Sequence, residues 1–159
     1  MRRLQKRSST GINPLWHMYR FIRFPKVLKQ TVIIEFCRFI PSMPLKRYVY
    51  RRFLNMSIGQ ATAIAYKVTP DLFYPELISI GDNCVIGYNT TILTHEILVD
   101  EYRQGQVIIG DHTMIGANVT ILPGVYIGKH VIIAAGSIVS KDIPDGCFAS
   151  GNPIQIHRK

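Results

Sequence analysis

The sequence predicts a mainly β chain: a parallel β-helix that follows a helical N-terminal segment. Three observations predict it. Isoleucine or valine recurs every six residues through most of the second half of the chain, and glycine or asparagine ends nearly every unit. The first 56 residues lack this repeat and are instead basic, aromatic and divided by prolines. An α-helix would need apolar spacings of three and four residues, which a step of six does not supply.

Residues 1–56 are expected to form a basic, aromatic-rich helical segment. Because proline interrupts a helix, the prolines of this segment divide it into short pieces. Their lengths favour helices over about residues 14–23, 26–39 and 44–54. Residues 1–10 carry four basic residues and little to bury, so we expect them to be mobile.

Residues 57–150 carry the repeat and are expected to form the β-helix. A second small or medium residue lies two positions before each repeated one, and positions two apart on a strand share a face. Each unit is therefore a very short strand with two inward side chains, and three units make one rung that stacks on the rung below. The repeated inward residues are Ile80, Ile86, Ile92, Ile109, Ile115, Ile121, Ile127, Ile133 and Val139.

The phase of the repeat assigns each strand to one of three sides, provided that the break after Ile92 replaces one corner. On the second side the outward residues Val85, Met114 and Ile132 are all apolar, so we expect a neighbouring subunit or the N-terminal segment to cover them. The three expected sides hold Ile80, Ile109 and Ile127; Ile86, Ile115 and Ile133; and Ile92, Ile121 and Val139.

The repeat is interrupted between Ile92 and Val107, where the sequence reads THEILVDEYRQGQ. An ordinary corner takes only a few residues. A loop over residues 95–106 must therefore leave the β-helix at His95 and return near Gln106. Loops held by a rigid scaffold are where binding and catalytic residues concentrate, so we expect the functional site at this interruption.

The motif THE, the loop after it and the run VIIGDHTMIGANVTILPGVYIGKHVIIAAGSIVSKDIPDGCFASGNP resemble the hexapeptide-repeat acyltransferases, especially the maltose, galactoside and xenobiotic O-acetyltransferases. The resemblance covers about residues 57–155. It implies a left-handed parallel β-helix and a homotrimer with active sites between chains. It also implies transfer of an acetyl or longer acyl group from acyl-CoA, acetyl-CoA above all, to a hydroxyl, less often an amine, of a sugar or glycan-like acceptor.

The same resemblance implies that His95 is the catalytic base, because it occupies the position of the family's histidine. A hydroxyl that attacks a thioester must lose its proton, and free imidazole has a pKa of about 6.5, near cellular pH. General base catalysis of this kind contributes about 10² to 10⁴ in rate. The group that orients the ring stays open between Glu96, Asp100, Glu101 and a backbone carbonyl.

The resemblance further implies that acetyl-CoA lies along the last rungs and meets the tail, residues 151–159. Small residues allow close approach of the pantetheine arm, and cations meet phosphates. No metal is expected, because the thioester is already activated. Two positions depart from the family pattern: Gln155 replaces an arginine and Met114 replaces a tryptophan. The implied donor contacts are Ala117, Ala135, Ser140, Lys141 and Arg158.

Charge is distributed unevenly along the chain. Residues 1–60 hold thirteen Lys/Arg and one acid, a net of +12, whereas residues 61–159 hold six Lys/Arg and nine acids, a net of −3. The basic part is expected to meet an anionic partner, either a membrane surface or an acidic polymer. No apolar run is long enough to span a membrane, and three cysteines without CxxC spacing fit a reducing cytoplasm.

Three other functions fit parts of the sequence. A catalytically silent scaffold or binding module would share the fold. A γ-type carbonic anhydrase uses this β-helix with histidine-bound zinc, and His95, His112 and His130 each lie three residues after an inward isoleucine, but the anhydrase ligand spacing is absent. A nucleic-acid binder could use the basic segment, but the sequence holds no recognisable module, so no nucleic-acid partner is expected.

Overall fold

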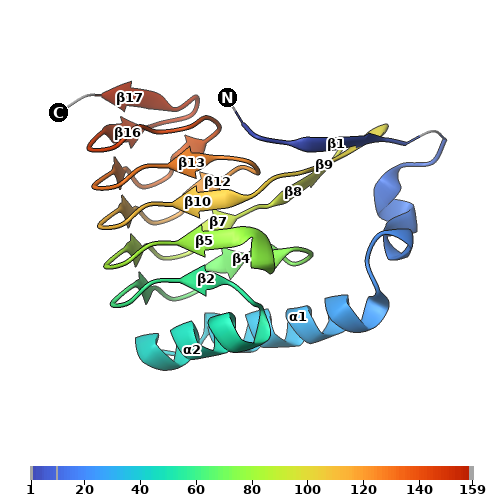
Figure 1. Ribbon diagram of the computed structural model, residues 1–159, viewed down its shortest axis with the longest axis horizontal. Coiled ribbons are helices and arrows are strands. Elements are labelled where there is room, and N and C mark those ends of the chain that lie inside the picture. The colour runs from blue at the N-terminus through green and yellow to red at the C-terminus, as the bar shows by residue number, and fades with distance from the viewer. Residues whose placement is uncertain (1, 10, 158–159) are drawn as a thin grey trace.

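The computed structural model describes residues 2–9 and 11–157. Within these residues, short strands coil upward in rungs above two α-helices, and the N-terminal strand lies beside the upper rungs (Figure 1). The described chain is mainly β, as predicted. Its helices belong to the N-terminal segment, apart from one short 3₁₀ turn, η2 Pro75–Leu77.

Each of the middle rungs contributes one strand to each of three sheets, and the strands of successive rungs run parallel. The first sheet contains β2 Ser57–Ile58, β5 Ile78–Ile80, β10 Val107–Ile109 and β13 Tyr126–Ile127. The second contains β3 Ala63–Ile64, β6 Val85–Ile86, β11 Met114–Ile115, β14 Ile132–Ile133, β16 Phe148–Ser150 and the antiparallel β17 Gln155–His157. The third contains β4 Thr69–Pro70, β7 Thr91–Ile92, β12 Thr120–Ile121 and β15 Ile138–Val139.

The register of these strands confirms the predicted phase. In the first sheet Ile109 pairs with Ile80 on one side and with Ile127 on the other. All the repeated residues are buried, so they stack into one continuous core. The other two sheets repeat the same order with the trios Ile86, Ile115 and Ile133, and Ile92, Ile121 and Val139.

The corners of the coil turn at residues with a positive φ angle, which glycine and asparagine tolerate best. Asn83, His112 and His130 occupy one corner on successive rungs, with φ angles of 51°, 58° and 54°. The rings of the two histidines stack with 4.9 Å between their centroids. These histidines therefore hold ordinary turn positions of the repeat.

The N-terminal segment holds a 3₁₀ helix, η1 Pro14–Arg20, and two α-helices, α1 Phe24–Arg38 and α2 Met43–Phe53. The expected mobility of residues 1–10 is wrong for β1 Gln5–Ser8, which pairs antiparallel with β9 Glu101–Gln104. The edge of β9 offers unpaired backbone groups, so this stretch gains ladder hydrogen bonds that its composition does not indicate. Positions 1 and 10 lie outside the described residues.

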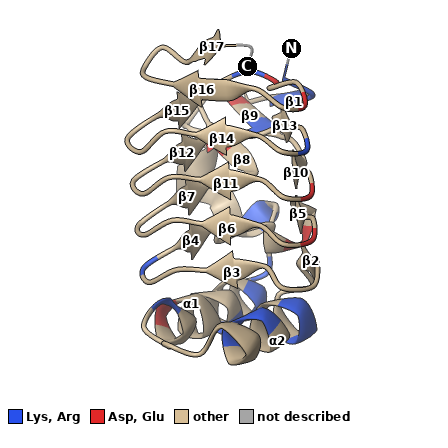
Figure 2. Cartoon of the chain, turned by 90° about the vertical axis from the view of Figure 1, so that its left-hand side faces the viewer, with Lys and Arg blue, Asp and Glu red and all other residues tan. Residues whose placement is uncertain are grey.

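Helices α1 and α2 close the lower end of the coil (Figure 2). A terminal rung has backbone groups with no further strand to meet, and a bare edge invites pairing with another chain. Here Lys46 Nζ donates to the carbonyls of Ile64 and Ala65 at 3.1 and 3.0 Å, and Arg47 Nε donates to the carbonyl of Gly59 at 2.6 Å. Side chains of α2 thus take the place of a lower rung.

Replacing Lys46 with alanine removes two of these three hydrogen bonds at a position that is 1% exposed. Buried carbonyls that lose their partners cost about 1 to 3 kcal/mol each. We expect Lys46→Ala to lower the free energy of unfolding, measured by urea denaturation, by about 2 to 4 kcal/mol. Lys29→Ala, at an exposed position of α1, should stay within about 0.5 kcal/mol of the wild type. Equal effects of the two changes would contradict the capping role.

Candidate active site

The predicted interruption is a β-hairpin that leaves the coil after β7 and returns at β10 (Figure 1). Its strands are β8 His95–Ile97 and β9, and β1 adds a third antiparallel strand on the far side of β9. His95 pairs with Gln104, and the carbonyl of Thr94 accepts a hydrogen bond from Gly105 N at 2.8 Å. His95 is therefore held at the root of the hairpin, where the hairpin meets the coil.

Asp71 lies beside His95 although 24 positions separate them in the chain. It follows β4 directly, in the stretch that leads to η2. Its Oδ2 is 2.7 Å from Nδ1 of His95; the carboxylate side chain is fully buried, whereas 17% of the imidazole side chain is exposed. The first rung thus supplies the carboxylate, and the second rung supplies the imidazole.

Backbone N–H groups hold the Asp71 carboxylate in place. Oδ1 accepts hydrogen bonds from Phe73 N and Tyr74 N at 2.7 and 2.9 Å, and Oδ2 accepts one from Thr94 N at 2.7 Å. Burial raises the pKa of this carboxyl, but the hydrogen bond and charge of His95, together with the backbone donors, outweigh burial and leave the pKa below its ordinary value. Asp71 is therefore ionised at neutral pH.

An ionised carboxylate can only accept hydrogen bonds, so His95 must donate its Nδ1 proton to Asp71. In the neutral ring the proton then lies on Nδ1, and Nε2 carries a lone pair. In this arrangement a histidine can remove a proton from a substrate while the carboxylate stabilises the imidazolium that forms. The pair can therefore act as a general base.

Aromatic rings surround the imidazole of His95. Phe73 stacks on it with 4.4 Å between centroids and 17° between planes, and Tyr102 lies nearly parallel to it at 6.2 Å. Phe21, from the N-terminal segment, stacks in turn on Tyr102 at 5.8 Å. Burial raises the pKa of the Tyr102 phenol, and the neighbouring Tyr74 raises it further, so this hydroxyl stays protonated. The Asp71–His95 pair, here called the dyad, thus has apolar walls.

The N-terminal segment supports the site from outside the coil. Ile22 and Val27 form a small apolar cluster with Phe73. Lys26 Nζ donates to Glu76 Oε1 at 2.6 Å. Both contacts hold the stretch that carries the Asp71 carboxylate, so the prediction that this segment covers part of the β-helix is confirmed here.

Asp71 is not among the residues that the sequence pattern predicts for the site. Two of the candidate hairpin carboxylates, Glu96 and Glu101, pair with arginines and not with the imidazole. The sequence does contain an indication, because Pro70 and Ile80 are ten positions apart where the repeat takes six. The extra residues form a second, smaller excursion, one rung below the hairpin and at the same corner.

Ser140 and Lys141, two of the residues implied for the acyl donor, lie exposed at the corner after β15. This corner stands two rungs above the one where the chain leaves β7 for His95. Ser140 and Lys141 thus lie at the same corner of the coil as the root of the hairpin, two rungs above it. Arg158 lies outside the described residues.

Ala117 and Ala135 lie at the other edge of the third sheet, before β12 and β15. They occupy the same corner on successive rungs, where Gly136 N donates to the carbonyl of Ala117 at 2.8 Å. The width of the sheet separates this corner from His95. Within one chain the structure does not bring the alanines and the dyad together.

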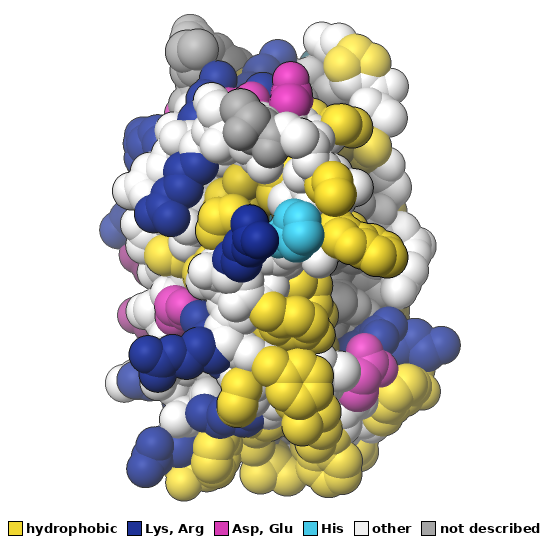
Figure 3. Space-filling view, turned by 90° about the vertical axis from the view of Figure 1, so that its right-hand side faces the viewer, with side chains coloured by type: hydrophobic (Ala, Val, Ile, Leu, Met, Phe, Trp, Pro, Cys, Tyr) yellow, Lys and Arg dark blue, Asp and Glu magenta, His cyan; other side chains and the backbone are white. Residues whose placement is uncertain are grey.

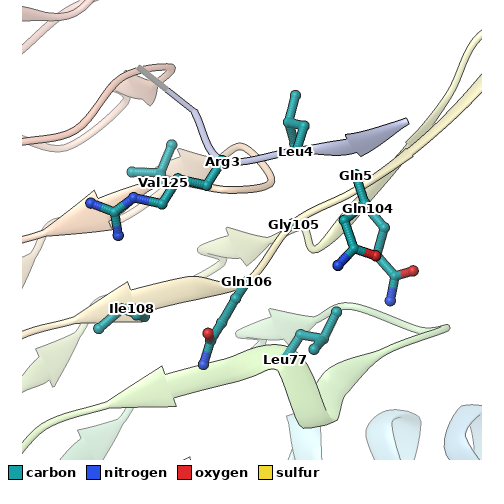
Figure 4. Close-up of a pocket in the computed structure, with 9 residues that line it drawn as sticks. All are labelled: Arg3, Leu4, Gln5, Leu77, Gln104, Gly105, Gln106, Ile108 and Val125. Carbon is teal, nitrogen blue, oxygen red and sulfur yellow. The ribbon is translucent and has the colours of Figure 1, made fainter.

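A cavity of about 490 Å³ lies beside the hairpin (Figure 4). Strands β1 and β9 and the first sheet of the coil form its walls. Gln104 lines the cavity and is the ladder partner of His95, so the cavity begins one strand away from the dyad. Its lining consists of Arg3, Leu4, Gln5, Leu77, Gln104, Gly105, Gln106, Ile108 and Val125.

The described residues contain no group of three or more His, Cys, Asp or Glu side chains that could hold a metal ion. The helices found among them are all too short or too polar to cross a bilayer. The cysteines Cys37, Cys84 and Cys147 are free and buried.

Asp71→Asn tests the charge state of the buried carboxyl. Because the folded-state pKa is lowered, the stability that Asp71 contributes is complete above its ordinary value of 3.8 and is lost as pH falls through the folded value. We expect the variant to lose about 2 to 4 kcal/mol of unfolding free energy at pH 7, at least as much at about pH 5.5, and less below about pH 3.5. Asp100→Asn, at an exposed hairpin position, is the control. A deficit that is as large at about pH 2 as at pH 7 would contradict an ionised Asp71.

Comparisons with known proteins agree with this architecture. A family model described as bacterial transferase hexapeptide (six repeats) matches residues 106–141, and one described as hexapeptide repeat of succinyl-transferase matches residues 77–94. A protein of Staphylococcus aureus (strain MRSA252), named Putative acetyltransferase SAR0816, is 60% identical over 156 residues, which cover 98% of this chain and 97% of the relative.

Solved structures share the fold. A hexapeptide-repeat acetyltransferase of Vibrio cholerae, complexed with acetyl coenzyme A, matches with a TM-score of 0.72 and 23% identity over 85% of this chain and 87% of its own. A galactoside acetyltransferase in complex with coenzyme A matches with a TM-score of 0.63 and 25% identity over 85% and 80%. Because the identity to the staphylococcal relative extends over nearly the whole of both chains, this chain belongs to the hexapeptide-repeat acetyltransferase family.

Proposed function

We propose that the protein transfers an acetyl group from acetyl-CoA to a hydroxyl of a sugar or glycan-like acceptor, with His95 as the general base. The observation that carries this proposal is the buried Asp71 carboxylate 2.7 Å from Nδ1 of His95, which leaves Nε2 to take a proton. Family membership supports the donor, since the galactoside acetyltransferase was solved with coenzyme A. Transfer to an amine is the less favoured version.

The reaction needs one proton acceptor and no covalent intermediate. The acceptor hydroxyl donates a hydrogen bond to Nε2 of His95, and its oxygen attacks the carbonyl carbon of the thioester as the proton passes to Nε2. The carbon–sulfur bond then breaks, and the imidazolium returns the proton to the departing thiolate. Asp71 stabilises the imidazolium between these two transfers.

The cavity beside the hairpin supports a polyhydroxylated acceptor. Gln5, Gln104 and Gln106 line it together with Arg3. Amide side chains both donate and accept hydrogen bonds, which suits the hydroxyl groups of a sugar. Neighbouring strands lie about 5 Å apart, so an acceptor seated against Gln104 is one strand spacing from His95.

We place the complete site between the chains of a homotrimer. Because Ala117 and Ala135 lie across the third sheet from His95, a pantetheine arm that passes the alanines of one chain would meet the dyad of the next. The outward residues Val85 and Met114 are 50% and 43% exposed, which supports burial by a neighbouring subunit. In this proposal the coil is left-handed, as the family resemblance implies.

The proposal gives each part of the chain a role. Residues 57–150 form the catalytic β-helix with its excursion 95–106, residues 1–56 form the basic supporting segment, and the tail 151–159 meets the nucleotide of the donor. The three free, buried thiols support a reducing cytoplasm as the location. The basic N-terminal segment brings the enzyme to a membrane surface as a peripheral protein.

His95→Ala should lower turnover of acetyl-CoA with a sugar or polyol acceptor by at least about two orders of magnitude, because the attacking hydroxyl loses its proton acceptor. Thiol release measures turnover, and calorimetry should show nearly unchanged binding of acetyl-CoA. His112→Asn is the matched control, since it places a favoured residue at a corner with φ 58°, and should keep wild-type turnover. Wild-type-like turnover in His95→Ala would end the assignment, and a wild-type protein without turnover would favour a silent scaffold.

Lys141→Ala combined with Arg158→Ala should raise the Michaelis constant for acetyl-CoA ten-fold or more. Each charge-assisted hydrogen bond to phosphate contributes about 1.5 to 3 kcal/mol, and a ten-fold change corresponds to about 1.4 kcal/mol. Turnover at saturation should change less. Lys6→Ala combined with Arg7→Ala, at exposed positions of β1, should leave the constant unchanged. If the Lys6, Arg7 variant raises the constant and the Lys141, Arg158 variant does not, the donor site lies beside β1.

A further inference from the structure

Helix α1 is apolar on two opposite sides. Its inner residues Ile34 and Cys37 are buried in the core of the coil. Its outer residues recur at intervals of four and are exposed: Leu28 by 53%, Val32 by 61% and Phe36 by 71%. A contiguous exposed apolar patch commonly marks a surface that meets a partner or a membrane. A partner for the outer side of α1 is therefore expected.

Helix α2 continues this surface with aromatic and cationic side chains. Leu45 and Tyr48 are 48% and 59% exposed. Arg47, Arg51 and Arg52 line a shallow hollow of about 390 Å³ together with Tyr48. None of the three guanidinium groups forms an ion pair with a carboxylate among the described residues. The hollow can therefore receive an anionic group.

The two helices lie across the end of the coil, so their outer sides face away from the rungs (Figure 2). In Figure 3, hydrophobic side chains gather at this lower end, with Lys and Arg side chains beside them. The single acid among residues 1–60 is Glu35, and Arg38 pairs with it at 2.8 Å. The end of the molecule is thus an apolar and cationic surface.

We propose that this surface, the outer side of α1 and α2 and here called the cap face, docks on an anionic lipid bilayer. Interfacial helices lie in the plane of the membrane, with apolar and aromatic side chains at the acyl boundary and Lys or Arg at the headgroups. The cap face offers Leu28, Val32, Phe36, Leu45 and Tyr48 to the boundary and Lys29, Arg51 and Arg52 to the headgroups.

A second copy of the chain fits the cap face less well. A two-fold contact sets the same surface of both chains together, so Lys29, Arg51 and Arg52 of one copy would meet the same cations of the other. Like charges brought together in an interface oppose association. A bilayer with anionic lipids offers the opposite charge over a surface broad enough for both helices.

Docking through the cap face stands the coil upright on the bilayer. A packed helix is about 10 Å thick and one rung adds about 5 Å, so His95, at the end of the second rung, would stand about 15 Å above the surface. If the proposed acetyl transfer holds, a glycan carried on a lipid headgroup reaches this height. The docking itself does not depend on that activity.

Flotation of the full-length protein with vesicles tests the proposal. At low salt the wild type should float with phosphatidylcholine vesicles that contain about 30% phosphatidylglycerol, float far less with pure phosphatidylcholine, and lose binding as salt rises. Val32→Glu combined with Phe36→Glu should reduce the partition coefficient for the anionic vesicles about ten-fold or more. Val99→Glu, at a hairpin position that is 77% exposed, is the matched control and should bind as the wild type does.

Circular dichroism and the thermal midpoint should show that the double variant is folded, and its acetyl-CoA turnover with a soluble acceptor should match that of the wild type. Arg51→Gln combined with Arg52→Gln should weaken binding to the anionic vesicles without affecting the little that binds neutral ones. Failure of the wild type to float, or equal flotation of the Val32, Phe36 variant, would overturn the proposal. If the wild type does not float and the Val32, Phe36 variant sediments without vesicles at a lower mass than the wild type, the cap face is instead an interface between copies of this chain.

Discussion

The rest of the structure depends on backbone hydrogen bonds between successive rungs. A strand of two residues is not stable alone, but the ladder repeats: Gly81 N donates to Ile109 O at 2.8 Å, and the next rung repeats the bond at the same corner. This ladder fixes which residue stands above which. Two excursions at one corner, on consecutive rungs, therefore bring Asp71 under His95. The dyad is a consequence of the stacking, and the hairpin adds the ring of Tyr102 beside the imidazole.

A ladder of this kind leaves ends and edges that need partners, and one segment serves several of them. The N-terminal residues run from β1, beside the upper rungs, past the hairpin to the helices under the coil (Figure 1). Along this path they extend the hairpin sheet, place Phe21 against Tyr102, and supply Lys46 to the carbonyls of the first rung. The same N-terminal segment thus supports the Asp71–His95 pair and closes the lower end of the coil.

The coil and its three sides could be predicted because each repeated isoleucine or valine, such as Ile109, is a buried core residue. The position of His95 could be predicted because an insertion breaks the repeat. Asp71 could not, since its partner is a neighbour across rungs and its excursion adds only four residues to the step. β1 could not be predicted either, because backbone groups of β9, rather than apolar side chains, hold it. Ala117 lies apart from His95 in one chain, so that part of the site stays a prediction.

An ionised Asp71 fixes the proton of the neutral His95 ring on Nδ1, and the protonation of each ring nitrogen can be measured directly. Nitrogen-15 NMR of protein labelled in its histidine rings, recorded at alkaline pH, distinguishes a protonated from an unprotonated ring nitrogen. The 2.7 Å contact predicts a protonated Nδ1 and a bare Nε2 for His95, and loss of this preference in Asp71→Asn. A wild-type ring that carries its proton on Nε2 would contradict the assignment of His95 as the base, because the nitrogen that faces the acceptor would then have no lone pair.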